Sequence, residues 1–224
     1  MLVWIHGGRF TLGAGRDYDG TKLAADGIVV VTINHRLGAF GFLAHPALAS
    51  RPGGPSGNYG LMDQQAALRW VQENIGRFGG DPRNVTIAGQ SSGGLSVLAH
   101  MVSRGSCGLF HRAIVQSGSF ALTQQSLATA EADGEAFAAK AGCRDQTADC
   151  LRRLSAADLV CNFPGAAIPG VVDGAVLEES VGTALPAGRF ARVPILNGTN
   201  HDEERDFITA EAVIDSAFVP VPSR

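Results

Sequence analysis

Apolar and polar residues follow one another along this chain in blocks of strand and helix length. Continuous apolar runs long enough for one strand each occur at residues 2–5, 28–33, 85–88, 113–116 and 193–197. Unbroken runs of this kind are typical of parallel strands that are covered on both faces. The pattern therefore predicts a buried parallel sheet.

Helical periodicity appears between these runs. The clearest helix is predicted at about residues 61–78, where apolar side chains recur at helical spacing and Gly79 with Pro82 ends the pattern. A short helix is expected at residues 21–25 and another after Ser91. Because strands and helices alternate with short connections, the sequence predicts right-handed crossovers and an open α/β sheet.

Beyond Ser119 the character of the chain changes. Residues 124–160 are rich in alanine and more polar, so a helical cap or lid is expected within about 120–170. Residues 171–180 resemble a turn-bearing loop, and the run at 193–197 is the last predicted strand. With 224 residues, the chain is expected to form a single domain, 1–224, that contains this cap.

The composition removes several classes of function. A net charge of −3 and a pI of about 6.0 give no reason to expect nucleic acid or an anionic membrane as partner. The apolar runs are far shorter than the ~20 residues of a membrane span, and residues 1–5 lack the basic start and apolar length of a signal peptide. The compartment and the oligomeric state stay open.

Four cysteines are present, without the spacing of a metal site, and no cofactor or metal is expected. Cys143 and Cys150 flank a short polar loop. From the residues alone, a local disulfide and two free thiols are both acceptable interpretations.

The sequence most indicative of chemistry is GQSSG at residues 89–93, which follows a strand and precedes a helix. A strand, a Gly-x-Ser-x-Gly turn and a helix form a nucleophile elbow, which exposes the serine hydroxyl at a helix N-terminus. This context favours Ser91 as a catalytic nucleophile over a glycine turn that merely packs a helix on a sheet.

The glycine loop at residues 6–10 follows the first strand and can direct N–H groups toward the elbow, where the N–H of Ser92 joins them in an oxyanion hole. An ordinary loop is the alternative.

An acid and a base are needed to complete a triad. Glu203 follows the last strand, 112 residues after Ser91, although spacing alone favours a solvated acidic loop there. Of the six histidines, none follows Glu203. His100 and His111 are expected in packing or surface positions, and His201 is too close to Glu203 to be a good candidate for the base.

Taken together, these motifs resemble the type B carboxylesterase/cholinesterase family of α/β-hydrolases. The matching segments run in family order: VWIHGG (3–8), NHRLG (34–38), NYGLMDQ (58–64), FGGDPRNVT (78–86), GQSSG (89–93), LFHRAI (109–114), QSGS (116–119) and GTNHDE (198–203). The resemblance implies an α/β-hydrolase fold, incomplete at both ends, and a serine esterase that acts on a small-molecule ester through an acyl-enzyme.

Residue by residue, the resemblance implies Ser91 as nucleophile, Glu203 as triad acid and Ser117 as a hydroxyl near that acid. It implies the N–H groups of Gly8, Arg9 and Ser92 as the oxyanion hole, and it favours a Cys143–Cys150 disulfide.

Several positions depart from the family pattern. Arg9 replaces a glycine, Ser92 a common alanine and Glu204 a common glycine. Gln90 replaces a glutamate, which removes a negative charge and argues for neutral rather than cationic esters.

Length is the largest departure, because family members are roughly twice this size, and residues 213–224 match no family motif. The chain is therefore expected to be a central fragment that lacks the catalytic histidine, and to be nearly inactive alone. A longer parent protein could be secreted. A non-catalytic adhesion or scaffold relative and a lipase are the alternatives.

Overall fold

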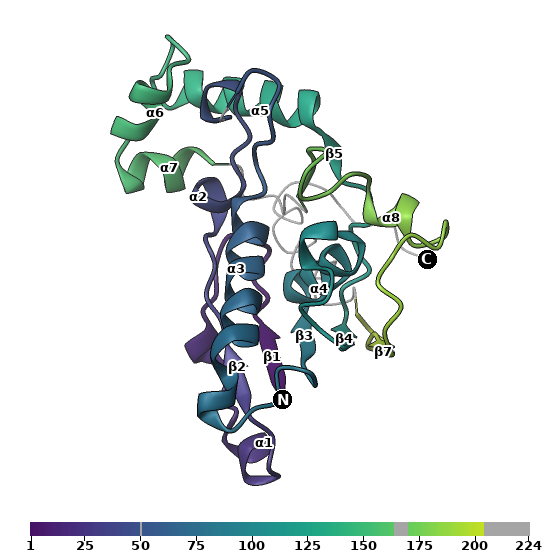
Figure 1. Cartoon of the computed structure of the whole chain (residues 1–224). Coiled ribbons are helices and arrows are strands. Elements are labelled where there is room, and N and C mark those ends of the chain that lie inside the picture. The colour runs from purple at the N-terminus through teal and green to yellow at the C-terminus, as the bar shows by residue number, and fades with distance from the viewer. Residues whose placement is uncertain (50, 164–169, 204–224) are drawn as a thin grey trace, which may run out of the picture.

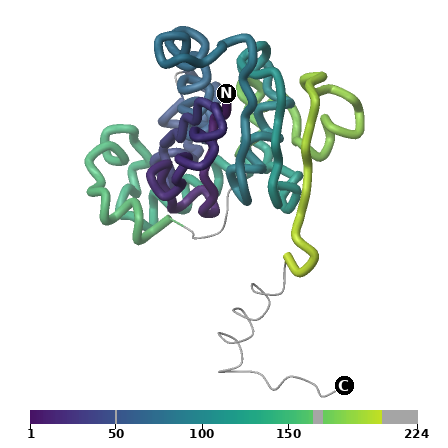
Figure 2. The backbone as a smooth tube through the Cα atoms, turned by 90° about the horizontal axis from the view of Figure 1, so that it is seen from below, coloured from purple at the N-terminus to yellow at the C-terminus, as the bar shows by residue number. Residues whose placement is uncertain are grey.

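The computed structural model describes residues 1–49, 51–163 and 170–203. Its centre is a five-stranded, wholly parallel sheet in the order β2-β1-β3-β4-β7 (Figure 1). The strands are β1 (Leu2–Ile5), β2 (Val30–Thr32), β3 (Thr86–Gln90), β4 (Arg112–Gln116) and β7 (Ile195–Gly198). The predicted parallel sheet is thus present, and β7 forms one of its outer strands (Figure 2).

One face of this sheet holds the main core. Val3 pairs with Ile87 and Ile87 with Ala113, so these buried side chains project from the same face. The long helix α3 (Tyr59–Asn74) and the elbow helix α4 (Ser92–Val102) contribute Leu68 and Leu95 to the same apolar cluster.

In the described part of the chain the two faces of the sheet are covered unequally. The other face carries half-buried residues such as Trp4 and Ile114, because α3 and α4 both pack against the first face. The side chains of β7 are exposed throughout.

The region 120–170, where a cap was predicted, is mainly helical in its described part. It contains α5 (Leu127–Lys140), α6 (Ala148–Arg153) and α7 (Ala156–Asn162), which lie together beyond the upper ends of the strands in Figure 1. A disulfide joins Cys143 to Cys150, with their Cα atoms 5.6 Å apart, and so links the end of α5 to α6. Cys107 and Cys161 are free and exposed.

Smaller elements were not predicted. They include α2 (Gly38–Phe42), α8 (Val181–Ala184) and a two-stranded parallel sheet of β5 (Gln125–Ser126) and β6 (Val171–Val172), whereas α1 (Thr21–Ala25) matches its prediction. Short 3-10 helices occupy Gly15–Asp17, Pro46–Leu48, Ile75–Phe78 and Arg104–Ser106.

None of the helices in the described part of the chain is both long and apolar enough to cross a bilayer. Glu204 and residues 213–224, where no family motif was recognised from the sequence, lie outside the described residues.

Candidate active site

The candidate site lies where the direction of strand addition changes. From β1 the chain adds β2 on one side and then returns to place β3 on the other side. In open α/β sheets, ligands bind beside the carboxyl ends of the strands at such a switch point. β1 ends at Ile5, which pairs with Gly89 of β3, so the glycine loop after β1 and the turn after β3 begin next to each other.

Ser91 occupies the turn between β3 and α4. Its φ of 56° and ψ of −125° place it in a backbone conformation that L-residues rarely adopt, and it is the N-cap of α4. Its N–H donates to the carbonyl oxygen of Gln116 on β4 (2.9 Å), and its own carbonyl accepts from Leu95 (2.9 Å). These bonds fix the turn from both sides. The side chain is half-buried.

The glycines of the elbow are required for close packing. A Cβ at Gly93 would lie 2.0 Å from the carbonyl oxygen of Ile5, and one at Gly89 would lie 2.4 Å from the backbone of Gly93. Glycine therefore lets α4 begin directly against β1 and β3, where the unpaired N–H groups of its first turn can face a substrate oxygen.

The loop after β1 has an unusual backbone. Gly8, Arg9 and Phe10 have φ values of 117°, 57° and 61°, so three consecutive residues are left-handed. A Cβ at Gly8 would lie 2.2 Å from the carbonyl oxygen of Leu12, so this position requires glycine. The Arg9 side chain, in contrast, is exposed, and the loop accommodates it.

One contact joins this loop to the elbow. The N–H of Phe10 donates to the hydroxyl of Ser92 over 3.4 Å, and both residues are buried. The predicted oxyanion residues Gly8, Arg9 and Ser92 are thus held in one neighbourhood. The hydroxyl of Ser92, which the sequence interpretation left without a role, contributes to this arrangement.

Glu203 and Ser117 meet at the end of the adjacent strands. β4 lies between β3 and β7, and Gln116 pairs with both Gln90 and Gly198, so Ser117 follows β4 at the level at which Ser91 follows β3. The Ser117 hydroxyl donates a hydrogen bond to the Glu203 carboxylate, and the N–H of Asn200 does so over 2.6 Å. These hydrogen bonds, with that from Ser117 the most important, lower the pKa of Glu203 and keep it ionised.

None of the contacts that the structure gives for the six histidines, all of which are described, is with Glu203. His6 and His35 stack with ring centroids 4.5 Å apart, His45 contacts Gln146, and His201 faces Asp202 with a side chain that is 94% exposed. Their contacts support the prediction that His100 and His111 have packing roles, because His111 Nδ1 accepts from the N–H of Val85 and His100 is fully buried.

His100 belongs to a buried polar network that no sequence signal indicated. Its Nε2 lies 2.8 Å from Oε1 of Gln64 and its Nδ1 2.9 Å from the hydroxyl of Ser106. Gln64 also donates to Ser96, whose hydroxyl donates to the carbonyl of Ser92. Burial lowers the pKa of His100 to about 3, so the ring is neutral and ties α3 to the elbow helix.

The model of the carboxylesterase family matches residues 1–217. The chain belongs to the carboxylesterase family. This confirms the resemblance noted from the sequence motifs.

Carboxylesterase relatives are similar across most of the chain. This chain is 41% identical to a para-nitrobenzyl esterase of Bacillus subtilis, in an alignment that covers 96% of the chain. It is 40% identical to a fumonisin B1 esterase of Sphingopyxis macrogoltabida, in an alignment that covers 92% of the chain. A crystal structure of a Geobacillus stearothermophilus carboxylesterase matches 99% of the chain with a TM-score of 0.86 and 40% identity. This likeness confirms the predicted α/β-hydrolase fold.

The chain is shorter than these carboxylesterases. It spans 46% and 40% of the two relatives and 52% of the Geobacillus structure.

Proposed function

We propose that this chain carries the nucleophile, the oxyanion hole and the triad acid of a serine carboxylic-ester hydrolase. The observation that carries the proposal is the backbone of Ser91, held in a strained turn at the start of α4 and joined through Ser92 to the loop after β1. Strain of this kind is kept where the fold needs a side chain in one exact position.

The residues support a two-step acyl transfer. The Ser91 oxygen attacks the carbonyl carbon of an ester, and the N–H groups of Gly8, Arg9 and Ser92 stabilise the negative charge on the carbonyl oxygen. The ester C–O bond then breaks, the alcohol leaves with the serine proton, and water hydrolyses the acyl-enzyme. Glu203, ionised and oriented by Ser117, would hold the imidazolium of a histidine that carries the proton.

Because none of the six histidines follows Glu203, we propose that the base lies outside this sequence. The chain alone should then hydrolyse esters far more slowly than a complete esterase does, since loss of the base of a triad costs on the order of 10⁶ in kcat. The missing negative charge at Gln90, which lines a cavity of about 380 Å³ beside Ser117 and Asn200, favours neutral esters.

The test uses a fluorophosphonate that reacts with activated serines. The purified chain is treated with the probe in the presence and absence of added imidazole, which supplies a base, and the modified residue is identified by mass spectrometry. We expect selective labelling of Ser91 that imidazole accelerates and Ser91→Ala abolishes, while Ser119→Ala, at an exposed serine, has no effect.

Two results would contradict the proposal. Equal labelling of Ser91 and Ser119 would remove the case for an activated nucleophile. Hydrolysis of p-nitrophenyl acetate at ordinary esterase rates by the chain alone would show that no outside histidine is required.

For charge preference, Gln90→Glu is expected to raise labelling by a cationic probe relative to a neutral one.

A further inference from the structure

A cavity of about 350 Å³ lies between α2, the start of α3 and the helices α6 and α7. It lies where two small apolar clusters meet, because Leu43 belongs to one cluster, Leu151 belongs to the other, and Leu48 packs against both. Its apolar lining residues are Ala39, Phe40, Leu43, Leu48, Leu151 and Leu159. The volume and the apolar walls are typical of small-molecule sites.

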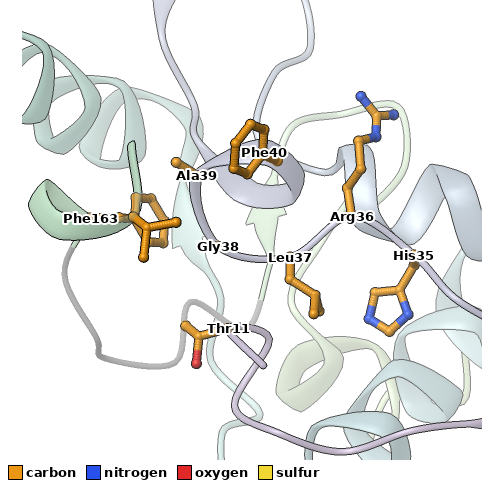
Figure 3. A pocket seen from close by; sticks show the side chains of 9 residues that line it. Thr11, His35, Arg36, Leu37, Gly38, Ala39, Phe40 and Phe163 are labelled. Atoms are coloured by element: carbon orange, nitrogen blue, oxygen red, sulfur yellow. The ribbon is translucent and has the colours of Figure 1, made fainter. Parts of the chain in front are cut away.

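This cavity is separate from the candidate active site. None of the described residues that line it is the proposed nucleophile, triad acid or part of the oxyanion hole. Arg36, Ala39 and Phe40 also line a neighbouring cavity of about 390 Å³, which reaches Thr11 of the loop after β1 (Figure 3). In Figure 3 the Arg36 side chain extends away from Thr11. The helix α2 therefore forms a wall that the two cavities share.

The charge beside the cavity is positive. Arg36 is balanced by Asp63 through two side-chain hydrogen bonds of 2.8 Å, and its guanidinium lies 5.5 Å from the centre of the Tyr59 ring. Arg152, near the end of α6, is exposed and forms no ion pair with any residue that the structure describes. No acidic side chain occurs among the described lining residues. One positive charge thus remains beside an apolar cavity, where it favours an anion.

The disulfide holds the helix that carries this charge. Cys150 lies in α6, two residues before Arg152, and is bonded to Cys143, which follows α5. Leu151, between Cys150 and Arg152, is buried against the same part of the chain. A group on an anchored element loses less conformational entropy on binding than one on a free loop, so the position of Arg152 favours ligand binding.

We propose that this cavity binds a monocarboxylate with an apolar chain, its carboxylate beside Arg152 and its chain between α2 and α7. The guanidinium offers several N–H donors to the two carboxylate oxygens, while the apolar lining residues contact the chain. A neutral molecule would gain only the apolar contacts, and a cation would be repelled. The proposal is independent of the esterase chemistry, because it uses none of the proposed catalytic residues.

The experiment uses sodium octanoate, whose binding to the purified chain is measured by isothermal titration calorimetry. Octanol and octyltrimethylammonium are the neutral and cationic comparisons with the same alkyl chain. We expect octanoate to bind about fivefold more tightly than octanol, the upper range for one exposed ion pair, and the cation to bind more weakly than either. From butanoate to octanoate, affinity should rise about fourfold per methylene until the cavity is filled. Equal affinity for all three octyl compounds would overturn the proposal.

A matched pair of arginine variants tests the charge. Arg152→Gln should lower the affinity for octanoate about fivefold and leave the affinity for octanol unchanged. Arg153→Gln is the control, because Arg153 is exposed, is the next residue of α6 and does not line the cavity. An equal loss of octanoate affinity in both variants would reflect only the net charge of the chain and would overturn the site.

A second pair tests the location. Leu159→Gln places a polar amide on the α7 wall of this cavity, whereas Val160→Gln places one in the neighbouring cavity of Figure 3. We expect Leu159→Gln to weaken octanoate binding about tenfold and Val160→Gln to leave it unchanged. If Val160→Gln weakened binding as much or more, octanoate would occupy the neighbouring cavity and the proposal would fail. Because Leu159 is half-buried, the exposed Arg152→Gln keeps the test decisive if Leu159→Gln does not fold.

Discussion

At the residue scale, the hydroxyl of Ser92 holds the oxyanion loop in a conformation that two of its residues disfavour. Arg9 and Phe10 are both left-handed, at a cost of about 1–2 kcal/mol each. The buried bond from the Phe10 N–H to Ser92 offsets part of that cost.

We therefore predict that Ser92→Ala loosens the loop selectively. Hydrogen exchange at Phe10 should accelerate about fivefold, and imidazole-assisted labelling of Ser91 should slow by a few-fold, because a net hydrogen bond contributes about 1 kcal/mol. Ser96→Ala is the control on the same helix, since it removes a buried hydroxyl that does not contact Phe10. Equal acceleration in both variants would show only general destabilisation.

His100 makes stability depend on pH. Its pKa is about 3 in the folded chain and about 6.5 when unfolded, so the unfolded state binds the proton first as the pH falls. The stability contributed by the neutral ring is complete above pH 6.5 and is lost between pH 6.5 and 3, by at most about 1.4 kcal/mol per pH unit.

His100→Gln should therefore flatten the fall in unfolding free energy between pH 6.5 and 4.5, whatever its effect at pH 7. Urea unfolding at several pH values measures this slope. His201→Gln, at an exposed histidine, should leave the slope as in the natural chain. An identical slope in His100→Gln would mean that another group, such as His35, governs acid sensitivity.

At the scale of elements, local pattern and tertiary contact determine different parts of the fold. The sheet strands were predictable because continuous apolar runs mark them, and α3 because its apolar side chains repeat at helical spacing. The helix α2 could not be predicted in this way, because Gly38 and Gly41 lower the helix propensity of its sequence. Gly41 is needed there because a Cβ would lie 2.2 Å from the carbonyl of Arg36, a contact that no sequence pattern shows.

In the candidate site, too, some features could be predicted from the sequence and others depend on tertiary contacts. Ser91 and the loop after β1 could be proposed from motifs in a strand–turn–helix order, whereas Glu203 could be proposed only from the family resemblance. The contacts of Ser92 with Phe10 and of Gln64 with His100 join residues 82 and 36 positions apart in the chain. Such long-range pairs follow only from the packed structure.

The Cys143–Cys150 disulfide is expected to stabilise the helical region of α5 and α6. The disulfide closes a short loop between α5 and α6, and Gln146 within that loop contacts buried His45 over 2.8 Å. By the entropy of closing so short a loop, Cys150→Ser should destabilise the cap by about 2–3 kcal/mol. Hydrogen exchange should increase in α5 and α6 and around His45, and much less in β1 and β3.

Reduction with dithiothreitol should reproduce this effect in the natural chain and have none in Cys150→Ser. Cys161→Ser is the control, because Cys161 is free and exposed. If Cys150→Ser raised exchange equally in cap and sheet, the disulfide would stabilise the whole chain rather than the cap.

At the scale of the whole molecule, the sheet of the described chain has an outer strand that is open to solvent. β7 pairs only with β4 in that sheet, and its Ile195 and Leu196 are 45% and 67% exposed. Exposed apolar edge strands pair with other chains, and charged side chains at the edge prevent such pairing.

We accordingly predict that the purified 224-residue chain self-associates with rising concentration and that Leu196→Lys weakens this association by about tenfold or more. Sedimentation velocity over a concentration series measures the effect. Trp70→Lys is the matched control, because it removes a large apolar side chain that is 46% exposed but lies on α3. If both variants weakened association equally, general surface hydrophobicity would be the cause. A selective effect of Leu196→Lys would identify β7 as the edge through which this sheet extends.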